Sequence, residues 1–411
     1  MDLPLILARQ REVLRSSSSF RLLFGSTLIS GLGTWLAVIA LSVDVFDRTH
    51  SGVWVSALLI ADFLPAVAIG LLLSPLVDRL SRKGLLVGAD LVRLAAFVLL
   101  ALAVRPWQIV ALAFVAGVAS GFARPVVQAG LPNLVPAESL PRANSLLRTA
   151  EQLTITIGTL IGGIVVAVSG PDVAYWLNAA SFLFSVGLLI RIPGGLLQEG
   201  RFVSHGHWHD LAEGIAAIRR SRALMTVLVV WALVEIGIAL VNVSEVVLAK
   251  VSFNAGDFGF GLMWTATGVG AVVGALFSSS WLERRSMTLV YTAAIALMAF
   301  GDAAAAVSPN VWVAVWCILV AGIGNATAIV CGSLLVQRSS PDNLRGRTFT
   351  LIMGSHFAVL GIGMAVAGPL VNAVGARWVW GIASVFIALA AVTGFAMLRR
   401  APELVPEPAP L

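Results

Sequence analysis

Apolar runs long enough to cross a lipid bilayer dominate this sequence. A spanning helix needs about 20 mainly apolar residues. We count twelve such runs, at residues 21–45, 52–76, 84–104, 108–131, 150–169, 173–192, 223–248, 258–281, 287–307, 310–334, 348–371 and 375–398. The ten-residue alternating segments of membrane barrels do not occur. The pattern predicts an all-α membrane protein with twelve transmembrane helices.

The overall composition excludes a soluble protein of ordinary type. Hydrophobic residues make up 58% of the chain and charged residues only 12%, whereas soluble proteins carry roughly 25% charged residues. A soluble domain of this length could not cover its surface with so few polar groups. We therefore expect lipid to be the main solvent of the chain.

The positions of the basic residues predict the orientation. With the N-terminus placed inside, 21 of the 27 Lys and Arg residues lie on the cytoplasmic side and two, Arg93 and Arg124, lie within runs. The four on the outer side are Arg48, Arg105, Lys250 and Arg377. Cytoplasmic loops of membrane proteins carry the excess of positive charge, so both termini are predicted to be cytoplasmic. The net charge of +6 is then explained by topology and anionic lipid, without nucleic acid as a partner.

The chain divides into two similar halves. We expect an N-terminal six-helix bundle at 1–192, a cytoplasmic linker with an amphipathic helix at 193–222, a C-terminal six-helix bundle at 223–400 and a flexible tail at 401–411. Asp78-Arg79 after the second run and Glu283-Arg284 after the eighth lie about 204 residues apart, and the loops after the fourth and tenth runs match at the same offset. Two matches at one period indicate an internal duplication.

Three segments resemble the major facilitator superfamily. The loop after the second run reads Ser74-Pro-Leu-Val-Asp78-Arg79-Leu-Ser-Arg82-Lys83-Gly84, and the fifth run contains Ile157-Gly158-Thr-Leu-Ile-Gly162-Gly163. The third segment is Gly88-Ala-Asp90-Leu-Val-Arg93. The sequence is most similar to the subgroup of macrolide, multidrug and siderophore exporters. The resemblance implies the major facilitator fold and transport by a secondary carrier.

The loop after the second run is predicted to form a gating latch. Asp78 would face the positive end of a helix, and Arg79, Arg82 and Lys83 would pair with acids across the two halves in one access state. The alternative is that these residues only hold the cytoplasmic orientation.

Three charges within runs form a second candidate group. Asp90 and Arg93 are three residues apart and share a helix face, and Arg124 lies at a similar depth. Charges inside a bilayer usually pair or face water. The group is interpreted either as a structural ion pair or as a gating and coupling network.

Asp62 and Glu235 are the predicted proton-coupling and substrate-binding carboxylates. Asp62 lies within the second run and Glu235 near the middle of the seventh. A carboxyl group shielded from water can exchange a proton near neutral pH, and a carboxylate attracts cationic drugs. The alternative is that both acids only fix helix packing.

Other polar and aromatic residues within the runs indicate a functional role less strongly. Trp35, Trp264 and His356 are candidates for lining the substrate cavity, with core packing as the alternative. Acids near helix ends are expected to be solvated or to cap helices, and these are Asp44, Glu151, Glu245 and Asp302. His205, His207 and His209 lie in the linker without an acidic or cysteine partner, so no metal site is predicted.

These observations predict a secondary active transporter, a proton-coupled exporter of amphipathic drugs that works by rocker-switch alternating access. We expect a monomer in a bacterial inner membrane, with protons, membrane lipids and a small-molecule substrate as partners and no cofactor. No phosphate-binding loop or zinc-hydrolase motif occurs, and an enzyme is not expected. The alternatives are a siderophore or lysolipid transporter, an uncoupled or inward-acting carrier, a receptor or scaffold, and an intramembrane enzyme.

Overall fold

The computed structural model describes residues 13–14, 17–72, 80–197, 215–216, 218–340 and 345–399. The chain divides into two compact units. Unit 1 comprises residues 1–203 and 255–265, and unit 2 comprises residues 204–254 and 266–411. Twelve helices of 19 residues or more lie in the described parts of the chain.

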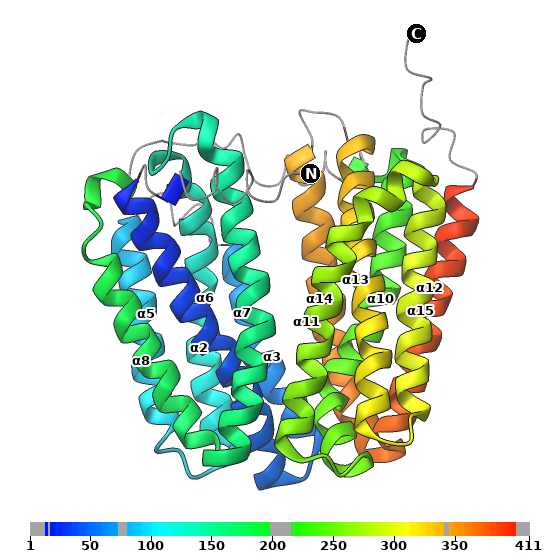
Figure 1. Ribbon diagram of the computed structural model, residues 1–411, viewed down its shortest axis with the longest axis horizontal. Helices are drawn as coiled ribbons and strands as arrows, with labels where there is room; N and C mark the ends of the chain where they lie inside the picture. Colours follow the sequence, from blue (N-terminus) through cyan, green and yellow to red (C-terminus); the bar gives the residue numbers. More distant parts are fainter. Residues whose placement is uncertain are drawn as a thin grey trace. The chain divides into compact units, whose positions relative to one another are not determined.

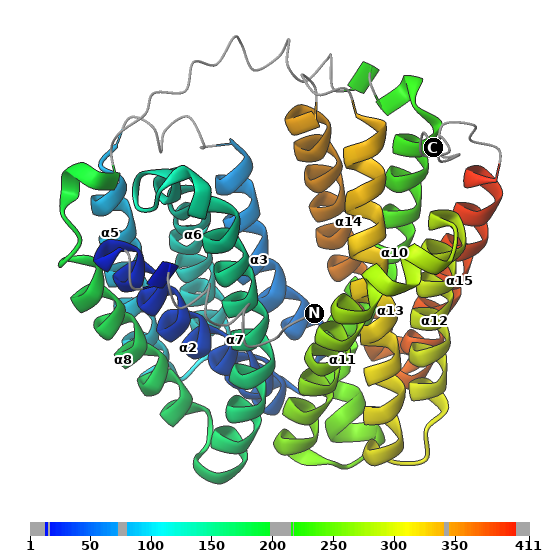
Figure 2. The same ribbon diagram turned by 45° about the horizontal axis from the view of Figure 1, so that its top comes forward.

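Unit 1 is a bundle of long helices (Figure 1). They are α2 (Ser18–Thr49), α3 (Gly52–Leu72), α5 (Arg82–Leu100), α6 (Pro106–Gly130), α7 (Leu140–Ser169) and α8 (Pro171–Leu189). Helix α2 packs against α7 and α8, α3 packs against α6, and α5 packs against both α6 and α8. The pair α5 and α8 lies side by side in Figure 2.

Unit 2 repeats this packing order. Its helices are α10 (Arg222–Val247), α11 (Gly256–Arg284), α12 (Met287–Val307), α13 (Val311–Ser339), α14 (Arg345–Val374) and α15 (Ala376–Leu398). The first residues of α11 group with unit 1. Helix α10 packs against α14 and α15, and α12 packs against α13 and α15. Each contact has its counterpart in unit 1, as expected for a duplicated bundle.

Serine caps fix where several helices begin. Ser81 accepts a hydrogen bond from the backbone N–H of Gly84 at the start of α5, and Ser286 does the same for Leu289 at the start of α12. Such caps satisfy a backbone N–H that has no partner within the helix. The two caps are 205 residues apart, so they also place α5 and α12 in register within the duplication.

Glycines make the sharp turns before α8 and α15. Gly170 has φ of 79° and Gly375 has φ of 83°, a left-handed backbone conformation that residues with a Cβ rarely adopt. These glycines are also 205 residues apart. The turn at Gly170 separates the fifth and sixth apolar runs, which the sequence leaves almost continuous.

Eleven of the helices are long and apolar enough to cross a membrane. The remaining long helix, α5, contains four charged residues, Arg82, Lys83, Asp90 and Arg93. The described residues therefore contain eleven candidate spans of the twelve predicted, and the spanning role of α5 stays a prediction.

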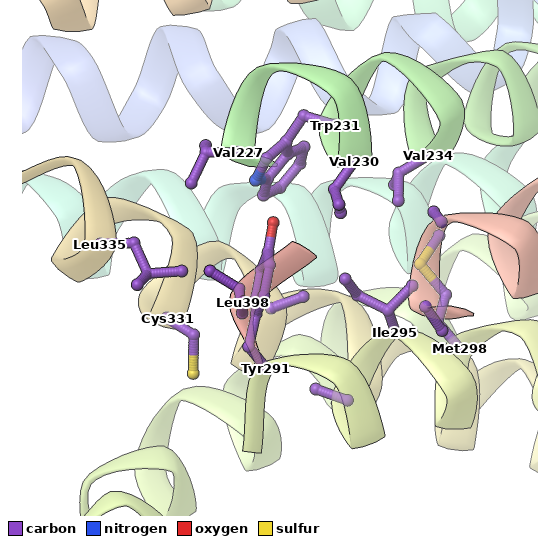
Figure 3. Close-up of a cluster of buried hydrophobic side chains, with 14 of the residues drawn as sticks. Val227, Val230, Trp231, Val234, Tyr291, Ile295, Met298, Cys331, Leu335 and Leu398 are labelled. Carbon is purple, nitrogen blue, oxygen red and sulfur yellow. The ribbon is translucent and has the colours of Figure 1, made fainter. Parts of the chain in front are cut away.

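The core of unit 2 contains a buried cluster of aromatic and aliphatic side chains from α10, α12, α13 and α15 (Figure 3). Tyr291 is fully buried, and its hydroxyl points toward the indole of Trp231. A Cβ at Gly332 would lie 2.7 Å from Nε1 of Trp231, so only glycine leaves room for that ring. These contacts fix the middle of α10, close to Glu235.

Some predictions fall on residues that the structure does not describe. These are the latch residues Asp78 and Arg79, most of the linker helix, the linker histidines and the tail from residue 401.

Candidate functional site

A polar cavity of about 260 Å³ lies within unit 1, between α2, α5, α6, α7 and α8. Hydroxyl and amide side chains supply much of its wall. These are Ser26, Thr27, Ser30, Thr34, Ser120, Gln128, Asn144, Thr154 and Ser185. Several of these hydroxyls bond to carbonyls of their own helix, as Thr34 does to Ser30 at 2.7 Å, which keeps their donors satisfied in an apolar bundle.

An ion pair forms the charged part of this cavity. Asp90 and Arg93 on α5 make a salt bridge, and Asp90 is only 3% exposed. Ser185 on α8 donates a 2.6 Å hydrogen bond to the other oxygen of Asp90. The Arg93 guanidinium lies 4.4 Å from the centre of the Phe182 ring, a cation–π contact. The predicted pairing of Asp90 with Arg93 is thus present, whereas its role in gating stays a prediction.

Asp62 lies on α3 and is half-buried. The backbone beside Asp62 is held tightly, because a Cβ on Gly117 of α6 would lie 2.2 Å from the Asp62 carbonyl oxygen. Close helix approach through small residues is common in membrane bundles.

Trp35 and Trp264 are brought together. Their ring centroids lie 5.9 Å apart with the planes tilted by 44°, and both rings belong to unit 1. Trp35 also lines the polar cavity. A Cβ on Gly158 would lie 2.8 Å from the Trp35 Cβ, so α7 packs directly against this part of α2. The cavity thus combines a charged pair with an aromatic wall.

An exposed ion pair lies at the edge of the same cavity. Arg148 and Glu151 on α7 are 3.5 Å apart and both line the cavity. The side chain of Arg148 is 69% exposed, so the pair adds little stability. Its charges can instead attract polar solutes toward the cavity.

The two described latch residues contact backbone carbonyls within unit 1. Arg82 is 3% exposed and donates to the carbonyls of Ala129 and Leu197, at 3.2 and 2.9 Å. Lys83 donates to the carbonyls of Ile190 and Ile192, both at 2.7 Å. Cations are stabilised by the unpaired carbonyls at helix C-terminal ends. These bonds join the start of α5 to the ends of α6 and α8.

The remaining candidates are placed separately. Glu235 is half-buried on α10, and its carboxyl makes no hydrogen bond or ion pair with the residues that the structure describes. His356 is 3% exposed and stacks on Trp231, with ring centroids 5.2 Å apart. It thus lies against the core of unit 2, and a role in lining a cavity stays a prediction. Arg124 lies within α6, but its side chain is outside the described residues.

A family model for transmembrane secretion effectors of the major facilitator superfamily matches residues 14–406. The chain belongs to this family. Members of the superfamily are transporters rather than enzymes, and the recognition made from the sequence is confirmed.

Relatives of this transporter include named efflux pumps. It is 26% identical over 372 residues to the multidrug efflux pump Tap of Mycolicibacterium fortuitum, covering 86% of this chain and 89% of the pump. It is 21% identical over 374 residues to macrolide efflux protein A of Streptococcus pyogenes, covering 87% and 90%.

Solved structures share the transporter's fold. A bacterial homologue of the human lysosomal transporter Spinster, in an inward-facing conformation, superimposes with a TM-score of 0.74 at 13% identity, covering 95% of this chain and 99% of that one. The nucleoside transporter NupG gives 0.72 at 17% identity, covering 93% and 99%.

Acids near helix ends were expected either to be solvated or to cap helices, and solvation is wrong for three of them. Asp44, Glu245 and Asp302 are each 4% exposed. Asp44 is fully partnered, because Tyr175 donates to one oxygen at 3.0 Å and Arg48 to the other at 2.6 Å. A usable sequence signal was present for Asp302, which lies between Gly301 and Ala303, two small residues that let helices pack closely.

Proposed function

We propose that this transporter is a proton-coupled exporter of amphipathic small molecules that works by rocker-switch alternating access. The observation that carries the proposal is the cavity of unit 1, where the Asp90–Arg93 pair and hydroxyl groups face the Trp35 ring. An amphipathic molecule has both a polar and an apolar part, and this lining offers contacts for both. The names of the related efflux pumps support the outward direction.

The size of the cavity limits what it can bind alone. Its volume of about 260 Å³ lies just below the usual range for small-molecule sites, about 300–1,000 Å³. The cavity therefore accommodates a small drug, or one end of a larger molecule such as a macrolide. We expect the rest of a large substrate to contact other cavity-lining helices.

We propose a role for each acidic and basic residue that the sequence singles out. Asp62 and Glu235 exchange protons and attract cationic substrates. Asp78, Arg79, Arg82 and Lys83 form the gating latch. The Asp90–Arg93 pair, with Arg124, transmits changes at the substrate site to α5. The bundles at 1–192 and 223–400, joined by the linker at 193–222, rock about the substrate.

The protein's location and orientation are part of the proposed function. Both termini face the cytoplasm, the spans lie in a bacterial inner membrane, and the transporter acts as a monomer. Under this orientation α10 and α12 run from the cytoplasmic face outward.

The test is efflux from proteoliposomes under an imposed pH gradient. Lipophilic cationic dyes and macrolides are the probes, and wild type is compared with Asp62→Asn and Glu235→Gln. We expect gradient-driven flux in wild type and its loss in at least one variant. The matched controls Asp172→Asn and Glu138→Gln change exposed acids outside the cavity and should keep full flux. A flux that is the same with and without the pH gradient, and in both variants, would instead indicate an uncoupled carrier.

A further inference from the structure

A second hollow, of about 400 Å³, lies within unit 2 between the end of α11, the first half of α12 and the middle of α13. We call it the α12 groove. Leu289, Ala293 and Leu297 line it, and residues four apart share one face of a helix. These three residues span about 12 Å along α12, less than half of the roughly 30 Å hydrocarbon core of a bilayer. The groove therefore fits within one leaflet.

Helix α13 contributes two small residues to the groove, Gly324 and Thr327. A Cβ at Gly324 would collide with the carbonyl oxygen of Ala294 on α12, so the two helices touch there. Thr327 is 1% exposed, and its hydroxyl donates to the carbonyl of Ile323 at 2.9 Å. Among the described residues of α12 and α13, the groove therefore offers hydrocarbon and no unpaired side-chain donor or acceptor.

Unit 1 has a larger side chain at the position that corresponds to Thr327. Phe122 lies 205 residues before Thr327, which is the offset between the serine caps and between the turn glycines. The Phe122 side chain packs against the apolar core of unit 1. Threonine takes less space than phenylalanine, so the groove of unit 2 does not follow from the duplication alone.

Two arginines line one end of the groove. Arg284 and Arg285 lie at the end of α11, and both are exposed. Neither guanidinium forms an ion pair or a hydrogen bond with a residue that the structure describes. Glu283 is also exposed, but it does not line the groove. The groove thus combines apolar walls with two positive charges at one end.

Trp281 indicates where this end lies in the membrane. It lines the groove beside the arginines and is 38% exposed, and its ring stacks on Phe277 with centroids 6.2 Å apart. Tryptophan is enriched at the boundary between lipid and water. The two arginines are therefore expected at the level of the lipid headgroups, with the apolar part of the groove extending into the hydrocarbon.

We infer that the α12 groove binds one anionic phospholipid. The phosphate pairs with Arg284 and Arg285, because guanidinium groups match the geometry of phosphate oxygens. One acyl chain lies along Leu289, Ala293 and Leu297. In the proposed orientation this end of α12 faces the cytoplasm, and the cytoplasmic leaflet carries the anionic lipids. This site goes beyond the proposed function, and lipid binding there does not depend on transport.

Native mass spectrometry of the full chain in detergent tests the charged end of the site. Dioleoyl phosphatidylglycerol is titrated, with dioleoyl phosphatidylcholine as the uncharged comparison. We expect wild type to bind one phosphatidylglycerol roughly 10-fold more tightly than phosphatidylcholine. Arg284→Gln/Arg285→Gln should weaken phosphatidylglycerol binding roughly 30-fold, the equivalent of about 1 kcal/mol for each basic residue.

The matched control removes the same charge elsewhere in unit 2. Arg219 and Arg220 are exposed and do not line the groove, so Arg219→Gln/Arg220→Gln should keep the wild-type affinity. Equal losses in the two double variants would show only a general attraction between positive charge and anionic lipid, and would overturn the site.

Filling the groove tests the apolar part. Ala293 is exposed and lines the groove, whereas Ala296 is exposed on α12 and does not line it. We expect Ala293→Phe to weaken phosphatidylglycerol binding roughly 10-fold and Ala296→Phe to leave it unchanged. If Ala293→Phe does not fold, Ala293→Leu must weaken binding in the same direction. Wild-type affinity in the filled variants would show that no acyl chain occupies the groove, and would overturn the inference.

Competition distinguishes the lipid from other occupants. Inorganic phosphate and a lipophilic cationic dye are added to the complex of wild type with phosphatidylglycerol, and we expect neither to displace the lipid. Displacement by inorganic phosphate would show that the arginines bind a soluble anion. Displacement by the dye would show that the groove takes the transporter's amphipathic substrates. Either result would overturn the assignment to a phospholipid.

Discussion

Ser185 on α8 donates a 2.6 Å hydrogen bond to Asp90 on α5, and this bond joins two helices of unit 1 through an acid that also pairs with Arg93. We expect Ser185→Ala to lower the free energy of unfolding, because a hydrogen bond to a charged group contributes about 1.5–3 kcal/mol. Denaturation in detergent micelles measures this change. Ser181→Ala is the matched control, since the Ser181 hydroxyl bonds only within α8. Equal losses in the two variants would contradict the interhelical role of Ser185.

The Asp90–Arg93 pair should behave as a coupled unit. We expect Asp90→Asn and Arg93→Gln to destabilise the protein separately, because breaking a buried pair costs about 3–5 kcal/mol. The double variant should lose less than the sum, since it leaves no buried charge uncompensated. A double-mutant cycle of unfolding free energies measures the coupling. Additive losses would show that the pair is solvated and contributes nothing as a pair.

The helical architecture follows from the sequence because lipid forces each spanning backbone to satisfy its own hydrogen bonds. Hydropathy therefore locates the spans, but it misses where some helices begin. Helix α7 starts at Leu140, ten residues before the apolar run at 150–169. Polar residues such as Arg142 and Asn144 continue the helix where water can solvate them. Their side chains end the apolar run but not the helical backbone.

Side-chain partners within the bundle were only partly predictable. The pairing of Asp90 with Arg93 follows from local helix geometry, since the two are three residues apart. The contribution of Ser185 does not, because it lies 95 residues from Asp90 and depends on how α8 packs against α5. The burial of Glu245 has the same origin. Its position near a helix end suggested that water would reach it, but packing against neighbouring helices excludes water.

Gly117 holds α3 and α6 close together beside Asp62. We expect Gly117→Ala to destabilise unit 1 by about 1–3 kcal/mol, the usual cost of overpacking, because the new Cβ would lie 2.2 Å from the Asp62 carbonyl oxygen. Gly187→Ala is the matched control, since its added Cβ would meet nothing within 4 Å. Thermal unfolding of both variants measures the difference. Equal stability of the two would contradict the close approach of α3 and α6.

Trp35 should determine the affinity for aromatic substrates. We expect Trp35→Ala to raise the KM for aromatic dyes roughly 2- to 10-fold, because aromatic contacts contribute about 0.5–1.5 kcal/mol. Trp312→Ala is the control, since Trp312 is 62% exposed near the start of α13 and should leave the KM unchanged. Initial efflux rates over a range of dye concentrations separate KM from maximal rate. A fall in maximal rate at constant KM would show instead that Trp35 supports packing against α7, where its Cβ meets Gly158.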